Sequence, residues 1–122
     1  MSKESLKKIS VEVMNNMAEN YLKTWSCYGP FTLDEKTDEN ISYKDSSGVL
    51  VSFSRPDHIE NWTENEGYGK ALKYLIDDPG MHNKAMWVFG TKELAGLITY
   101  HLSDCSGNPT DLGKKVYEAM VN

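Results

Sequence analysis

The sequence has few of the residues, and none of the segments, that mark a protein outside the globular class. Its 122 residues include only two cysteines, Cys27 and Cys105, which are too few for a disulfide-stapled scaffold. No apolar run approaches the roughly 18 residues that a transmembrane helix requires. The first residues, Met-Ser-Lys-Glu-Ser-Leu-Lys-Lys, are charged and lack the apolar stretch of a secretory signal. We therefore expect a soluble cytoplasmic protein with reduced thiols and no membrane contact, folded as one domain over residues 1–122.

Complete catalytic and metal-binding motifs are also lacking. The histidines and cysteines form neither Cys-x-x-Cys nor His-Glu-x-x-His, and His101 and Cys105 converge only if both lie on one helix. A thiol nucleophile would need a cysteine beside His101 and an acid such as Asp104, a set that common residue types produce by chance. We therefore predict no metal, no cofactor and no catalytic residues, and we favour a protein that is not an enzyme.

One short segment is similar to part of a phosphate-binding loop. Gly67-Tyr68-Gly69-Lys70 opens a predicted helix, where backbone N–H groups and a lysine can hold a phosphate. The full P-loop pattern is absent, and the preceding Glu64 and Glu66 would repel an anion. We interpret the glycines as a break between helices rather than as a nucleotide site.

The charge is unevenly distributed along the chain. The formal net charge is −5, yet residues 34–66 hold nine acidic side chains against three basic ones, a local balance of −6. Such an acidic pole repels phosphates, so we do not expect nucleic acid as a partner. A protein with a basic surface is the natural complement.

The N-terminal segment carries the clearest helical pattern. Apolar residues recur at spacings of three and four, as on an amphipathic helix that faces a core. They are Leu6, Ile9, Val13, Met14, Met17, Tyr21, Leu22 and Trp25. We predict a helix that begins near Ser2 or Ser5 and ends by Gly29-Pro30, with its Met and Trp side chains in the core.

Two segments are predicted to form hairpins. Residues 41–54 contain two short strand patterns around Asp45-Ser-Ser-Gly48. Residues 85–104 contain two apolar runs around a turn-like insert, with aromatic and β-branched residues typical of strands. For this second segment a helix that begins at Thr91, with Leu94, Leu97, Ile98 and Leu102 on one face, is the competing interpretation.

The remaining patterns are helical. Asp57 with Glu60 three positions later resembles a capping box, and the following helix should break at Gly67 and Gly69. A second piece over residues 68–76 should stop at Pro79-Gly80. Thr110 or Asp111 should cap a last helix. These elements predict an α+β fold in which a short antiparallel sheet of two hairpins packs against the N-terminal helix and one or two further helices, with the 68–76 helix among them.

Part of the chain resembles the SnoaL-like polyketide-cyclase branch of the NTF2-like superfamily. The residues that carry the resemblance are Tyr43-Lys44-Asp45 before a glycine turn, and His101 followed by Gly107-Asn-Pro-Thr110 and Gly113-Lys-Lys-Val116. Asp111 and Leu112 interrupt the second motif, and nine residues follow Gly113. The resemblance implies a curved sheet over a pocket, with Asp45 and His101 as polar pocket groups.

The acidic pole also contains aromatic residues, which are favoured anchors in protein interfaces. Flanking carboxylates can steer a partner that carries Lys and Arg. Burial of Trp62 beside Ile59 in the core is the alternative for the central aromatic residue. The predicted partner-binding residues are Asp34, Glu35, Asp38, Glu39, Glu60, Trp62, Glu64, Glu66 and Tyr68.

These observations give three hypotheses for function. The first is an inhibitory or immunity-type protein that docks its acidic, aromatic surface on a basic partner. The second is a pocket protein or small enzyme that binds or converts an apolar ligand, in a site lined by Tyr43, Phe53, Trp87, Tyr100 and His101. The third is a structural subunit, which would self-associate, and the sequence leaves a homo-oligomer open.

Overall fold

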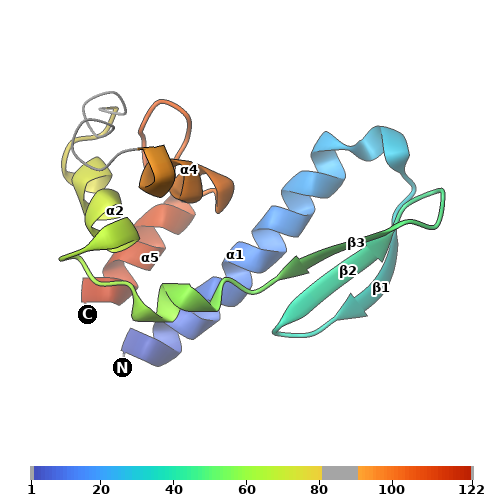
Figure 1. Ribbon diagram of the computed structural model, residues 1–122, viewed down its shortest axis with the longest axis horizontal. Helices are drawn as coiled ribbons and strands as arrows, with labels where there is room; N and C mark the ends of the chain where they lie inside the picture. Colours follow the sequence, from blue (N-terminus) through green and yellow to red (C-terminus); the bar gives the residue numbers. More distant parts are fainter. Residues whose placement is uncertain (1, 81–90, 122) are drawn as a thin grey trace.

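The computed structural model of the protein describes residues 2–80 and 91–121. Figure 1 shows helices gathered at one end, a three-stranded sheet at the other, and one long helix that joins them. The predicted α+β fold with a short antiparallel sheet is confirmed. In chain order the elements are α1 (Ser2–Thr24), the 3₁₀ turn η1 (Ser26–Tyr28), β1 (Thr32–Lys36), β2 (Asn40–Lys44), β3 (Leu50–Ser54), the 3₁₀ turn η2 (Asp57–Asn61), α2 (Gly67–Asp77), α4 (Thr91–Thr99) and α5 (Asp111–Val121).

The long helix α1 belongs to two cores at once. Consecutive helical positions point about 100° apart, so the neighbours Val13 and Met14 face different partners. Val13 packs into the core of the helices, whereas Met14 and Ala18 pack against Ile41 of the sheet. One face of α1 therefore organises the helices, and the adjacent face holds the sheet.

We call the first half of α1 with η2, α2, α4 and α5 the helical part. There α1 packs against η2 and α5, while α2 packs against α4 and α5 rather than covering the sheet as expected. Its core consists of Leu6, Val13, Ile59, Trp62, Ala71, Leu72, Leu75, Leu94, Leu97, Leu102, Val116 and Ala119.

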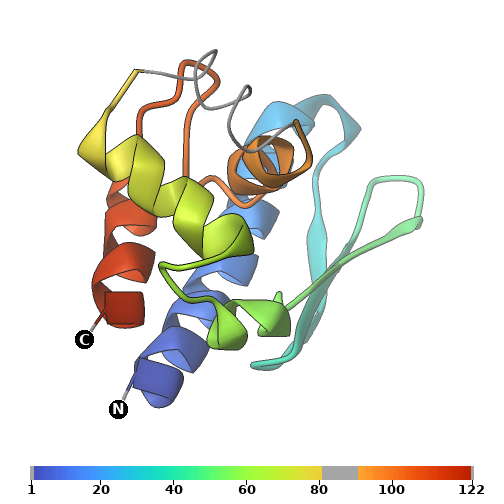
Figure 2. The same ribbon diagram turned by 60° about the vertical axis from the view of Figure 1, so that its left-hand side comes forward.

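The second half of α1, η1 and the sheet form what we call the sheet part. The strand order is β1-β2-β3, and both pairs are antiparallel. One face of the sheet packs on α1 through the side chains of Ile41, Tyr43 and Phe53. Figure 2 shows the sheet beside this helix. The other sheet face points to solvent.

The predicted hairpin over residues 85–104 is wrong for its described half, because residues 91–99 form the helix α4. Residues 85–90 lie outside the described residues. Leu94 and Leu97 are buried at helical spacing. The apparent alternation near Leu102 arises from a turn that closes the helix: the Leu102 N–H donates to Leu97 and the His101 N–H donates to Ile98.

Two further details differ from the sequence predictions. Trp25 is 44% exposed, because α1 ends one residue earlier and the indole lies against Tyr21 and Tyr28 instead of in the core. Strand β1 was not predicted, since all its residues are exposed and three of them are charged, which is unusual for a strand. Its pairing with β2 stabilises a strand conformation that its own residues do not favour.

Other predicted helix boundaries are confirmed in part. A break separates η2 from α2, and α2 ends at Asp77, before Pro79, but Gly69 lies inside α2. The predicted capping box of Asp57 and Glu60 is wrong, because η2 has no side-chain cap and Glu60 binds Arg55 instead. Thr110 caps α5, because its Oγ1 accepts a hydrogen bond of 3.0 Å from the Gly113 N–H. Within residues 2–80 and 91–121, no helix is both long and apolar enough to cross a membrane.

Candidate functional site

The residues of the predicted partner-binding site divide into two groups. Asp34 and Glu35 lie on β1, and Asp38 and Glu39 lie in the β1–β2 turn. The loop that carries Glu64 and Glu66 precedes α2 at the opposite end of the molecule (Figure 1). The carboxylates of the sheet and those of the loop before α2 therefore lie on separate surfaces in the fold.

A bulge in β1 places two consecutive carboxylates on the solvent face of the sheet. The pairing register with β2 shifts between Leu33 and Glu35. The Ser42 hydroxyl donates to Asp34 at 3.2 Å, and the Asn40 amide donates to Glu35 at 2.8 Å. Positions 40 and 42 share one face of β2, so both acids lie on that face, as a bulge allows.

Arg55 joins the sheet part to the helical part. Its Nε donates to both carboxylate oxygens of Glu39 at 3.2 Å, and its Nη1 donates to Glu60 and, at 2.9 Å, to the Ser10 hydroxyl. The Arg55 side chain is only 8% exposed, whereas Glu39 is 63% exposed. Glu39 and Glu60 are thus brought together from distant positions, but a buried guanidinium offsets their charge.

Aromatic rings gather around Trp62, which belongs to the helical core. The Trp62 and Tyr68 rings are stacked, with centroids 5.3 Å apart and planes at 13°. The Tyr100 hydroxyl lies 3.1 Å from His58 Nε2, and burial raises the pKa of this hydroxyl, with a further contribution from Tyr68. Trp62 is 9% exposed, so its core alternative holds and a partner meets mainly the rims of its neighbours.

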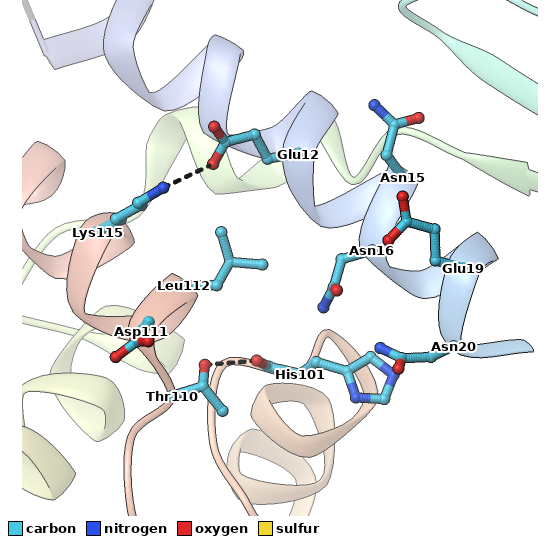
Figure 3. A pocket seen from close by; sticks show the side chains of 10 residues that line it. All are labelled: Glu12, Asn15, Asn16, Glu19, Asn20, His101, Thr110, Asp111, Leu112 and Lys115. Atoms are coloured by element: carbon cyan, nitrogen blue, oxygen red, sulfur yellow. Dashed lines mark hydrogen bonds and ion pairs between the residues drawn. The ribbon is translucent and has the colours of Figure 1, made fainter. Parts of the chain in front are cut away.

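A polar groove of about 650 Å³ lies between α1 and α5. Leu112 lies at its base, and the Lys115 ammonium meets Glu12 at 3.8 Å on one side, as drawn in Figure 3. Asn16 and Asn20 extend from α1 toward His101 on the other side (Figure 3). The complete lining is Glu12, Asn15, Asn16, Glu19, Asn20, His101, Thr110, Asp111, Leu112 and Lys115.

His101 reaches this groove from an unusual backbone conformation. Its φ of 58° lies in the left-handed region, at the helix-terminating position that glycine usually occupies. That conformation costs a residue with a Cβ about 1 kcal/mol. Its carbonyl oxygen accepts a 2.6 Å hydrogen bond from the Thr110 hydroxyl, which ties the end of α4 to the start of α5.

The residues expected for an apolar pocket do not come together. Tyr43 and Phe53 pack on α1, and Asp45 accepts hydrogen bonds from the N–H groups of Ser47 and Val49 in the hairpin turn. Trp87 lies outside the described residues. His101 lines the groove between α1 and α5, where its surroundings are polar.

Thiol and metal chemistry find no assembled site in the described part of the chain. Cys27 and Cys105 are free and exposed, and they lie in different parts of the fold. Asp104 does not orient His101, because its carboxylate accepts from the N–H groups of Ser106 and Asn108 in its own loop. Residues 2–80 and 91–121 contain no group of three or more His, Cys, Asp or Glu side chains that could hold a metal ion.

The groove was missed in the sequence, although a signal was present. Glu12, Asn16, Glu19 and Asn20 recur at spacings of three and four, as one polar stripe on the predicted N-terminal helix. Such a stripe is ordinarily a solvated helix face, so only the position of α5 shows that it lines a groove. Comparison with protein-family models, with curated proteins and with solved structures finds no match to this chain.

Proposed function

We propose that this protein inhibits a partner protein by binding to its basic surface through the solvent face of the sheet. The docking residues are Asp34 and Glu35 on the solvent face of β1. Asp38, in the adjoining turn beside the start of α1, contributes at the rim of this face. The observation that carries the proposal is the bulge, which puts two neighbouring carboxylates side by side on a strand whose five residues are all exposed. Covering a basic surface would block its other ligands, such as a nucleic acid.

Electrostatics is compatible with docking at this face. The Lys44 Nζ lies 3.8 Å from Asp34, and both side chains are exposed. Such an exposed pair contributes at most about 1 kcal/mol, so it leaves the patch acidic. On the other side of the turn, Lys7 and Lys8 of α1 line a groove together with Asp38. Carboxylates on an open face speed association with a basic partner, and the effect weakens as salt screens the charges.

In this proposal the protein acts in the cytoplasm. Cys27 and Cys105 are both exposed and free, which suits a reducing environment where exposed thiols stay reduced.

The test compares two isosteric neutral variants of the full chain. The partner is captured from cells of the natural source by crosslinking and purified, and its affinity is measured at two salt concentrations. The sheet variant D34N/E35Q/D38N should bind about tenfold more weakly and with a flatter salt dependence, given about 0.5 kcal/mol for each rim charge. The matched variant E64Q/E66Q should bind like the wild type. Unchanged affinity in the sheet variant, or an equal loss in both, contradicts the proposal.

A second candidate function is the binding of a small cationic ligand in the groove between α1 and α5. The observation that favours it is the convergence of three carboxylates and three side-chain amides against one lysine and one histidine. A planar guanidinium, with several donors, matches such a lining.

L-Argininamide is the probe for this second function, and uncharged L-citrullinamide is its control. In an NMR titration we expect saturable shifts of the Asn16, Asn20 and His101 side-chain signals with the first compound only. E19Q should weaken the binding, and E4Q, a substitution outside the groove, should not. Equal shifts with both compounds would rule out a site for cations.

A further inference from the structure

The two edges of the sheet differ in how they are protected against pairing with another chain. β1 carries Asp34, Glu35 and Lys36 and a bulge, which are features that protect an edge strand. β3 is the sequence Leu-Val-Ser-Phe-Ser, which contains no charge, and it pairs with β2 in an uninterrupted register. β3 is therefore the unprotected edge.

The hydrogen bonds at the ends of β3 show which backbone groups are free. The Asp45 N–H donates to the Val49 carbonyl at 3.0 Å, and the Arg55 N–H donates to the Glu39 carbonyl at 3.0 Å. Hydrogen-bonded pairs alternate along an antiparallel ladder, so Val51 and Phe53 bond to β2. The N–H and C=O groups of Leu50, Ser52 and Ser54 consequently point away from β2.

The side chains along this edge leave room for another strand. Leu50 is 55% exposed and Val49 is 57% exposed, and both serines of β3 are exposed. The described elements that pack substantially on β3 are β2, along its other edge, and α1, across one face. Unpaired backbone groups beside exposed apolar side chains are a template for strand addition.

We propose that β3 pairs antiparallel with β3 of a second copy of this chain, about a twofold axis at Ser52. In this register Ser52 is opposite Ser52 of the other copy, and Leu50 is opposite Ser54. Each of these pairs exchanges two backbone hydrogen bonds, so every outward-facing group of the strand finds a partner. Val51 and Phe53 meet across the axis on the α1 side.

Charge explains why the occupant is a second copy. A twofold axis brings every residue near the axis close to its own copy, so any charge there is repelled, and β3 carries none. The β1 strands lie at the outer edges of the joined sheet, five strand spacings or roughly 24 Å apart. That separation exceeds the Debye length of about 8 Å, so the acidic strands do not oppose the pairing.

The experiment measures the mass of the full chain in solution by sedimentation equilibrium over a concentration series. We expect a dimer for the wild type. S52K and S52E should each be monomeric, with self-association weakened tenfold or more, because like charges then face each other. Their equimolar mixture should dimerise again. T32K, which adds a charge to the exposed face of β1, is the matched control and should remain dimeric.

Hydrogen exchange separates this dimer from association through another surface. The amides of Leu50, Ser52 and Ser54 should be protected in the wild type and lose that protection in S52K, while the amides of Val51 and Phe53 stay protected in both. A wild type that is monomeric at every concentration overturns the proposal. So does a dimer that both Ser52 substitutions leave intact.

Discussion

The helical part and the sheet part of this protein are stabilised by cores of very different size. Twelve buried side chains, contributed by every described helix and by η2, form the core of the helical part. Among the described residues, the core beside the sheet consists of the buried apolar side chains Met14, Ala18 and Ile41, with partly buried neighbours such as Phe53. Because burial of apolar area is the main source of stability, the helical part should unfold last and the sheet should open first.

The two parts also differ in how many large apolar side chains they expose. Large apolar side chains are exposed at six described positions, and Val121 alone of these lies in the helical part. The other five are Trp25, Tyr28, Leu33, Val49 and Leu50. Exposed apolar side chains that gather in one region mark interaction surfaces. The sheet part, which we expect to be the less stable one, is therefore the part that we propose to contact other chains.

The largest effect is expected from a cavity in the core of the helical part. Leu97 is fully buried there, so Leu97→Ala should lower the free energy of unfolding by about 3 kcal/mol. The loss should be global, with the sheet and the helices melting together in urea. A Leu97→Ala protein in which the sheet alone loosens would break the comparison between the two parts.

The corresponding cavity in the sheet core should act locally. Ile41 is 2% exposed, and Ile41→Ala should lower the free energy of local opening of the sheet by about 2 kcal/mol. Hydrogen exchange should accelerate at the amides of β2 and β3, while those of α2 and α5 keep the wild-type rate. Equal acceleration in both parts would mean that the sheet has no separate opening.

Arg55 sharpens the comparison, because its side chain forms hydrogen bonds with residues of both parts. Arg55→Met should cost about 1–2 kcal/mol, since it leaves the carboxylate of Glu60, which is 27% exposed, without its guanidinium. In double-mutant cycles read by urea unfolding, Arg55 should couple more strongly to Glu60 than to Glu39, which is 63% exposed and screened by water. Equal coupling energies for Glu39 and Glu60 would show that the Arg55–Glu60 pair contributes no more than a solvent-exposed ion pair.

Sequence patterns predicted those elements whose signals are local. The apolar stripe of α1, the Asp45-Ser-Ser-Gly48 turn and the Thr110 cap each act within a few residues, and the structure has all three. The fold class follows from these elements. Structure that depends on residues close together in the chain can be predicted from the spacing of those residues.

Sequence patterns did not predict the features that depend on contacts between residues far apart in the chain. β1 is ordered by its pairing with β2, and α4 is a helix because Leu94 and Leu97 meet the core of the helical part. The predicted partner-binding site was one stretch of sequence, yet the fold separates Asp34 from Glu66 and places Arg55 against Glu39 and Glu60. Charge counted along the chain does not show which carboxylates a buried cation offsets.

The smallest effect is expected at the loop between α4 and α5, and it should stay within the helical part. The pKa of Asp104 is lowered, first by the hydrogen bond from the Asn108 N–H and then by further donors from Asn108, Ser106 and Gly107. A carboxyl with a lowered pKa in the folded protein adds stability above its unfolded pKa of about 4, and this is lost as the pH falls through the folded value. The stability of the wild type should therefore fall below pH 4 slightly more than that of Asp104→Asn.

NMR can locate this acid effect in one part of the molecule. As the pH falls, the amide signals of Ser106 and Asn108, which donate to the Asp104 carboxylate, should shift with its titration. The same amides in Asp104→Asn, which has no carboxyl at this position, should not follow that curve. The amides of β2 and β3, which belong to the sheet part, should give the same titration in both proteins. A difference at β2 or β3 would show that the loop and the sheet are coupled through α1, and that the two parts of the molecule do not respond independently.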